Sequence, residues 1–155
     1  MMTSDMMIRI LAGVISTLGF AILFKLKPKH IPFSMLCGFV ACVVYFPCSE
    51  VFDGSAFIPN FLAAFATALT AGILAIVCKT PSTVFLITGC ITLVPGSNLF
   101  YAMSNLLSKN YNTASLNLLI TLTVGVAIGG GILAASLAHY LIKYALYQYK
   151  KSSKK

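Results

Sequence analysis

Long runs without a charged side chain dominate this sequence. Asp, Glu, Lys and Arg are absent from residues 10–24, 31–49, 54–78, 80–108 and 110–142. A helix needs about 20 mostly apolar residues to cross a lipid core that is roughly 30 Å thick. The first two runs are near the lower limit for such a helix, and the last is generously long. The pattern therefore predicts an all-α, polytopic membrane protein with about five transmembrane helices.

The predicted spans account for almost the whole chain of 155 residues. The composition agrees, because only 9% of the residues are charged and 59% are hydrophobic, whereas soluble domains carry about 25% charged residues. We therefore expect a single transmembrane domain over residues 1–155, which ends in a basic tail at residues 143–155. The spans are expected near residues 6–24, 31–47, 57–78, 83–107 and 114–142.

The net charge of +8 is unevenly divided between the two sides that five spans would define. Nine lysines fall on one side, whereas Arg9, Lys109 and the three acidic residues fall on the other. Because positive charge marks the cytoplasmic side, we expect the N-terminus outside and the C-terminus in the cytoplasm. We interpret the basic tail as an anchor on the lipid bilayer, against anionic headgroups, and expect no binding of nucleic acid. The lysines expected in the cytoplasm are Lys25, Lys27, Lys29, Lys79, Lys143, Lys150, Lys151, Lys154 and Lys155.

No residue pattern indicates an enzyme or a metal site. The sequence has no HExxH, GxSxG or Walker motif, and no Asp, Glu, Lys or Arg lies inside a predicted span. The five cysteines lie mostly within or beside apolar runs, where cysteine behaves as a small hydrophobic residue. Neither His30 nor His139 has ligand-like spacing to them. We therefore expect no catalytic residue, no metal and no cofactor.

Small residues are concentrated in the third and fifth predicted spans. Ala64, Ala68 and Gly72 are four apart, and Gly125 and Gly129 form a G-x-x-x-G motif. Such stripes let helix backbones approach closely in lipid. The three consecutive glycines that begin at Gly129 also permit a bend. We interpret the stripes as packing surfaces, with the lining of a substrate path as the minority alternative.

The best candidate for a functional site is the Pro95-Gly96 pair in the fourth predicted span. Pro95 removes a backbone donor and clashes with the preceding turn, and Gly96 relaxes the backbone. A helix broken here exposes N–H groups at Ser97, Asn98 and Leu99, as in transporters whose half-helix N-termini face a substrate carboxylate. The alternative is a proline kink satisfied by neighbouring groups, with hydroxyls bonded to their own helix. The candidate substrate-binding residues are Pro95, Gly96, Ser97, Asn98, Thr92, Thr88 and Tyr101.

Around this pair the chain resembles the small subunit of the two-component threonine/serine exporter family. The most recognisable run is Leu93-Val94-Pro95-Gly96, followed by Tyr101 and Met103. The order, the spacing and the five-span topology also fit. Members often carry a further proline three residues before the Pro-Gly pair; here that residue is Thr92, so we expect a less sharp break. The other residues that carry the resemblance are Phe20, Phe24, Leu26, Pro28, Gly38, Pro81, Val84 and Phe85.

The resemblance implies a role, a partner and a location. Subunits of this type work with a larger subunit that supplies another membrane part and a soluble cytoplasmic part. Together they export small carboxylate-bearing metabolites, which are threonine and serine in the named members and a dicarboxylate in others. Export uses an ion gradient, and because this chain has no intramembrane acid, we expect the protonation site on the partner. The family is bacterial, which implies the cytoplasmic membrane.

Two alternatives to this role stay open at the level of sequence. The chain is either an exporter of a dicarboxylate such as succinate, or a non-transporting membrane scaffold that stabilises the larger subunit. In the scaffold, the Pro95-Gly96 break is a packing kink.

Overall fold

The computed structural model describes residues 2–52 and 54–152, and the side chains of residues 6–52 and 54–144. Every regular element in this part of the chain is a helix. In chain order the elements are α1 (Met2–Leu23), η1 (Pro28–His30), α2 (Ile31–Val51), α3 (Phe57–Cys78), α4 (Ser82–Cys90), η2 (Ile91–Leu93), α5 (Gly96–Leu107) and α6 (Tyr111–Ser152).

Five of these segments account for the predicted spans. Helices α1, α2, α3 and α6 are each long and apolar enough to cross a membrane. Helices α4 and α5 are shorter, but Ser82–Leu93 and Gly96–Leu107 together form a fifth segment that is bent by 56°. The prediction of a polytopic all-α membrane protein whose fourth span is broken at Pro95-Gly96 is confirmed.

Two helices extend beyond the residues at which we expected the spans to end. Helix α2 continues through Pro47 to Val51, and α6 runs on to Ser152, so that most of the expected tail is helical. Hydropathy indicates where a chain leaves the lipid, which need not be where its backbone stops being helical. The 42 residues of α6 correspond to roughly 63 Å at about 1.5 Å per residue, about twice the thickness of a lipid core.

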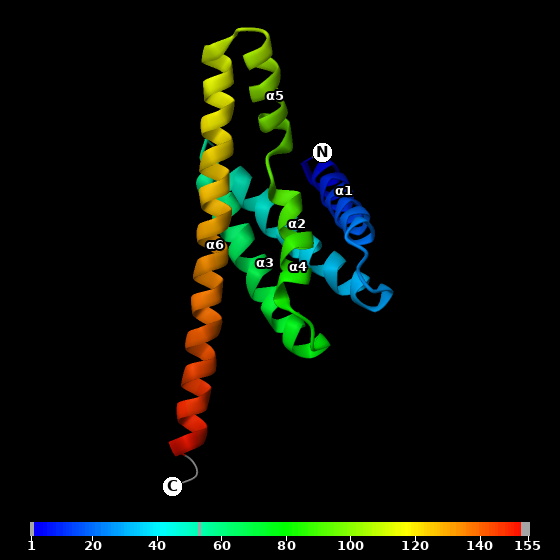
Figure 1. The fold of residues 1–155 in the computed structure, drawn as a ribbon, viewed down its shortest axis with the longest axis vertical. Coiled ribbons are helices and arrows are strands. Elements are labelled where there is room, and N and C mark those ends of the chain that lie inside the picture. Colours follow the sequence, from blue (N-terminus) through cyan, green and yellow to red (C-terminus); the bar gives the residue numbers. More distant parts are fainter. Residues whose placement is uncertain (1, 53, 153–155) are drawn as a thin grey trace.

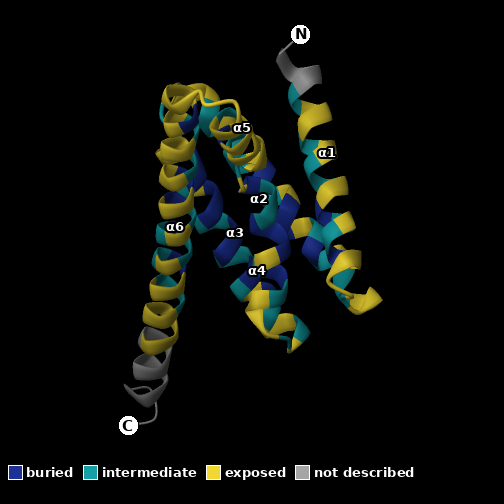
Figure 2. Cartoon of the chain, turned by 45° about the horizontal axis from the view of Figure 1, so that its top comes forward, coloured by how far each residue is buried: buried dark blue, intermediate teal, exposed yellow. Residues whose placement is uncertain are grey.

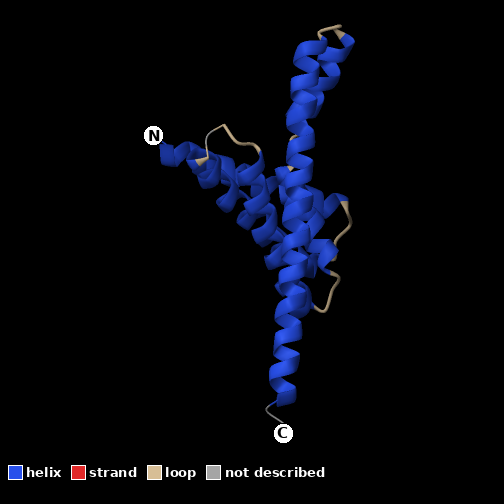
Figure 3. Cartoon of the chain, turned by 90° about the vertical axis from the view of Figure 1, so that its left-hand side faces the viewer, coloured by secondary structure: helices blue, strands red, loops and turns tan. Residues whose placement is uncertain are grey.

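The helices form a bundle from which one hairpin projects. Helix α2 packs between α1 on one side and α3 and α4 on the other, and α6 crosses the bundle along α3 (Figure 1). Helix α5 runs antiparallel to the first half of α6 and packs chiefly against it. Seen from the side, this α5–α6 hairpin rises above the rest of the bundle (Figure 3).

Small residues bring the helix backbones of the bundle close together. Gly38 of α2 lies directly against the side chain of Thr17 in α1. A Cβ atom at Gly89 of α4 would come within 2.9 Å of atoms of Thr67 in α3 and Cys37 in α2. Apolar burial drives helix association only weakly in lipid, so close van der Waals contact of this kind is what holds the bundle together.

The contact between α3 and α6 depends on Gly131, which lies outside the G-x-x-x-G motif. A Cβ atom at Gly131 would lie 2.6 Å from the carbonyl oxygen of Phe61 and 3.0 Å from the Cβ of Ala64. At Gly125 and Gly129, by contrast, an added Cβ would meet nothing within 4 Å. Within the described chain the Gly125-x-x-x-Gly129 motif therefore packs against no other helix, and its role as a packing surface stays a prediction.

Much of the outside of the bundle is exposed (Figure 2), and many of the exposed residues are large and apolar. Leu107 and Ile76, for example, have exposed fractions of 86% and 76%. Exposed apolar surface of this extent is rare on soluble monomers and is what a protein presents to lipid.

Candidate functional site

The break in the fourth span begins before the Pro-Gly pair. The α-helix ends at Cys90, a 3-10 turn covers Ile91–Leu93, and Val94 is extended with φ −66° and ψ 126°. A residue that precedes proline is driven out of the helical region by the proline ring, so the extended backbone of Val94 follows directly from Pro95. The preceding 3-10 turn tightens the last part of α4, and Val94 N–H donates to Ile91 O at 3.3 Å.

Helix α5 begins at Gly96 with no side-chain cap. The amide of Leu99, which we expected to be exposed, instead donates to Pro95 O at 3.1 Å. In the described chain the amides of Ser97 and Asn98 have no backbone acceptor. The first turn of α5 therefore presents two free N–H groups, together with the positive end of its helix dipole.

These N–H groups lie at a cavity of about 350 Å³, which we call the break cavity. Its walls come from four parts of the chain: the break itself, α2, the start of α3 and the first half of α6. Its lining residues are Tyr45, Ala56, Asn60, Thr92, Leu93, Val94, Pro95, Ser97, Asn98, Ile120 and Val124.

The polar side chains of the break cavity keep unused hydrogen-bonding capacity. Asn60 is only 4% exposed, and its Nδ2 donates to Ala56 O at 2.7 Å, which leaves its Oδ1 as an acceptor. Thr92 donates to Gly89 O at 2.9 Å, so its oxygen can still accept. Among the residues that the structure describes, no charged side chain lines the cavity. The arrangement suits a small polar ligand that brings both donors and acceptors.

The structure brings together some of the residues proposed from sequence and separates others. Thr92, Pro95, Ser97 and Asn98 line the break cavity, whereas Thr88 and Tyr101 do not. Tyr101 is 55% exposed and packs edge-on against the ring of Phe100, with the ring centroids 5.7 Å apart.

Gly96 is exposed, and a Cβ atom added there would meet nothing within 4 Å. It does not line the break cavity, and its part in the break is to begin α5.

Thr88 lies one turn before Thr92, buried between α4 and α2 with an exposed fraction of 1%. Ser34 of α2 donates to its hydroxyl at 2.5 Å, and Thr88 itself donates to Val84 O at 3.0 Å. Its hydrogen-bonding capacity is thus used within the protein, and its position fits a structural bond between two helices.

Removal of the Ser34–Thr88 bond is expected to destabilise the bundle. Thr88→Val should lower the free energy of unfolding by about 1 kcal/mol, a typical value for a hydrogen bond between membrane helices. Thermal unfolding in detergent measures the effect. Thr123→Val is the matched control, because Thr123 donates to Leu119 O at 2.9 Å on an exposed face of α6. Equal melting temperatures for the two variants would contradict this role.

The sequence did not reveal that residues of α2, α3 and α6 also line the break cavity. Tyr45 and Asn60 lie in other predicted spans, far from Pro95 along the chain, and Ile120 and Val124 are ordinary apolar residues. Asn60 offered a weak signal, because it is a buried amide in an otherwise apolar helix that is rich in alanine.

Several helices long and apolar enough to span a membrane, together with a bent pair at a polar cavity, are features found in membrane transporters. The chain belongs to the threonine/serine exporter family, ThrE, which its residues 9–138 match. The resemblance to this family, which the sequence shows most clearly at residues 93–103, is thereby confirmed. A membrane transport role is confirmed with it. No curated protein and no solved structure matches the chain.

Proposed function

We propose that this chain is the membrane subunit of a secondary transporter that exports small carboxylate-bearing metabolites of the threonine and serine type. The observation that supports this most directly is the break cavity, where unpaired polar groups gather in an otherwise apolar helical protein. Polar groups that are buried within a membrane-spanning protein are costly unless water or a ligand binds them. The volume of about 350 Å³ lies within the range of about 300 to 1,000 Å³ that is usual for small-molecule sites.

The substrate carboxylate binds at the first turn of α5. The free amides of Ser97 and Asn98 point out of the helix N-terminus, where an anion gains from both the N–H groups and the dipole. The dipole contributes about 0.3–1 kcal/mol at exposed positions and up to about 2 kcal/mol where the site is partly buried. The Ser97 hydroxyl and the Asn98 amide side chain border the same space and offer further donors.

The substrate ammonium group binds on the opposite wall. Asn60 Oδ1 and the Thr92 hydroxyl oxygen are acceptors with remaining capacity, and the hydroxyl of Tyr45 borders the same cavity. A hydrogen bond to a charged group contributes about 1.5–3 kcal/mol. Donors on α5 and acceptors on α3 and α4 therefore match the two ends of an amino acid.

The described lining of the break cavity holds no charged side chain, which favours an amino acid over a dicarboxylate. A zwitterion carries no net charge into the membrane, whereas a dicarboxylate such as succinate brings two negative charges that no lysine or arginine of this cavity balances. Succinate export is the alternative if the partner subunit supplies those cations.

The proposed transporter is completed by a larger subunit and is located in the bacterial cytoplasmic membrane. Transporter folds often contain two corresponding halves, each with a broken helix at the substrate site, and the described residues of this chain include one such helix pair. A second half from the partner would complete the pattern. The lysine distribution supports an N-terminus outside and a C-terminus in the cytoplasm.

Ser97→Ala tests whether the break cavity binds substrate. Cells that express both subunits are loaded with a threonine- or serine-containing dipeptide, and the efflux of the free amino acid is measured. The variant is expected to reduce efflux about tenfold, the equivalent of about 1.4 kcal/mol, without loss of complex formation. The control is Ser104→Ala, which changes an exposed serine of α5 outside the cavity. Normal efflux from Ser97→Ala would favour the scaffold role.

A further inference from the structure

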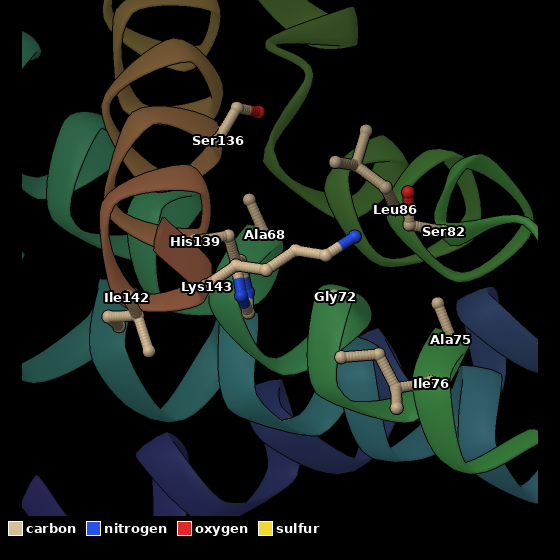
Figure 4. A pocket seen from close by; sticks show the side chains of 10 residues that line it. All are labelled: Ala68, Gly72, Ala75, Ile76, Ser82, Leu86, Ser136, His139, Ile142 and Lys143. Carbon is tan, nitrogen blue, oxygen red and sulfur yellow. The ribbon is translucent and has the colours of Figure 1, made fainter. Parts of the chain in front are cut away.

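A second recess lies where α3, α4 and α6 meet, away from the break cavity (Figure 4). It has a volume of about 650 Å³, and we call it the α3–α4–α6 recess. Along α6, the break cavity reaches Val124 and the recess begins at Ser136, which places them roughly 18 Å apart at about 1.5 Å per residue. Between them, Gly131 makes the closest backbone contact with α3. The two spaces are therefore separate.

The floor of the recess holds a histidine in a fixed orientation. The ring of His139 points from α6 toward Gly72 of α3 and fills the space that a larger residue at position 72 would need (Figure 4). Its Nε2 lies 3.1 Å from Leu69 O. A carbonyl oxygen only accepts, so Nε2 carries the hydrogen, and in the neutral ring Nδ1 is left as an acceptor.

A lysine extends across the same recess. Lys143 lies one turn after His139 on α6, and its side chain reaches toward Ser82 and Leu86 of α4 (Figure 4). Among the described side chains the only carboxylate is Glu50, which lies near the far end of α2. Lys143 therefore has no anionic partner within the part of the protein whose side chains are described. An ammonium group at the wall of a largely apolar recess attracts an anion.

We propose that the α3–α4–α6 recess binds the carboxylate group of a small metabolite, with Lys143 as its cationic partner. The hydroxyls of Ser82 and Ser136 border the recess and can donate further hydrogen bonds. His139 Nδ1 accepts from an ammonium group, if the metabolite carries one. In the orientation proposed above, this recess lies at the cytoplasmic end of the bundle. It is then the place where cargo is captured on the cytoplasmic side, before it reaches the break cavity. The assignment of the carboxylate as export cargo rests on the proposed function; the binding chemistry does not.

Binding can be measured on the full chain in lipid nanodiscs, without transport. The chain has no tryptophan, so Leu86→Trp places a single indole at the recess. Its fluorescence is expected to change saturably with L-threonine and not with L-threoninamide, which lacks the carboxylate. In this background Lys143→Gln should weaken the apparent affinity about tenfold, the loss expected when one charge-assisted hydrogen bond is removed. Lys143→Arg should retain the affinity.

Lys79→Gln is the matched control, because Lys79 lies in the turn between α3 and α4, at the same end of the bundle but outside the recess. Equal weakening by Lys79→Gln and Lys143→Gln would overturn the proposal, as would an equal response to L-threonine and L-threoninamide. So would the absence of binding both by fluorescence and by saturation-transfer NMR of L-threonine with the unmodified chain. If L-threonine binds in a way that depends on Lys143 but cells show no export, the proposed function is contradicted. The carboxylate site in the recess is then still supported.

Discussion

Gly131→Leu is expected to break the contact between α3 and α6 and to have the largest effect on stability of any single change considered. An added Cβ would lie 2.6 Å from Phe61 O, 3.0 Å from Ala64 Cβ and 3.0 Å from the Phe65 nitrogen. Two of these atoms belong to the α3 backbone and cannot rotate away, so the helices must separate. Overpacking of a well-packed interior costs about 1–3 kcal/mol, and occasionally more.

The melting temperature and the elution profile of the detergent-purified chain measure the effect of Gly131→Leu. The same substitution at Gly125 is the matched control, since it lies on the same helix and has no neighbour within 4 Å of an added Cβ. We expect Gly125→Leu to melt near the wild-type temperature and Gly131→Leu to melt well below it or to aggregate. Similar stabilities would show that the α3–α6 contact is not needed to hold the bundle together.

Asn60→Leu is expected to abolish most of the export activity while the protein remains in the membrane. Leucine has nearly the same size but removes Oδ1, which we assign as an acceptor for the substrate ammonium group. A site built to hydrogen-bond its substrate loses heavily when one polar group is left unpaired, and here the unpaired group would be the charged end of the substrate. At about 1.5–3 kcal/mol for a hydrogen bond to a charged group, we expect efflux to fall between about tenfold and about a hundredfold.

Asn117→Leu is the control for this prediction. Asn117 donates from Nδ2 to Thr113 O at 2.9 Å, the same i to i−4 bond that Asn60 makes with Ala56, but it lies outside the break cavity. Efflux from dipeptide-loaded cells is compared at equal membrane levels of each variant. If Asn60→Leu exports at the rate of Asn117→Leu, the break cavity does not bind the ammonium group.

Much of the fold could be predicted because lipid imposes a strong and local constraint on sequence. The runs without charge identified the spans, and the Pro95-Gly96 pair identified the break, whereas Pro47 by itself does not interrupt α2. The start of the break at Ile91 was not evident, because a 3-10 turn has no distinct residue pattern. Nor could the sequence tell which glycines of α6 face α3, because Gly125, Gly129 and Gly131 differ only in the rotation of the helix.

Of the residues in the candidate site, only those that lie close to Pro95 along the chain could be predicted. Thr92, Ser97 and Asn98 are close to Pro95 along the chain and lie together in space. Thr88 was proposed as a candidate together with Thr92, but the position of α2 gives Thr88 a different partner, Ser34. Asn60 entered the site only through the tertiary contact of α3 with the break, which depends on helix packing rather than on any motif.

Because α5 packs chiefly against α6, the α5–α6 hairpin can move as one rigid unit. The close contact at Gly131 holds α6 against α3 and is the point about which the hairpin would rotate. The non-helical residues Val94 and Pro95 form a hinge between α4 and α5. A swing of the hairpin about these points would change the direction in which the first turn of α5 presents the amides of Ser97 and Asn98 to the opposite wall. The carboxylate and ammonium ends of a bound amino acid would then be held by groups that no longer face each other, so that this motion would by itself lower the affinity of the site.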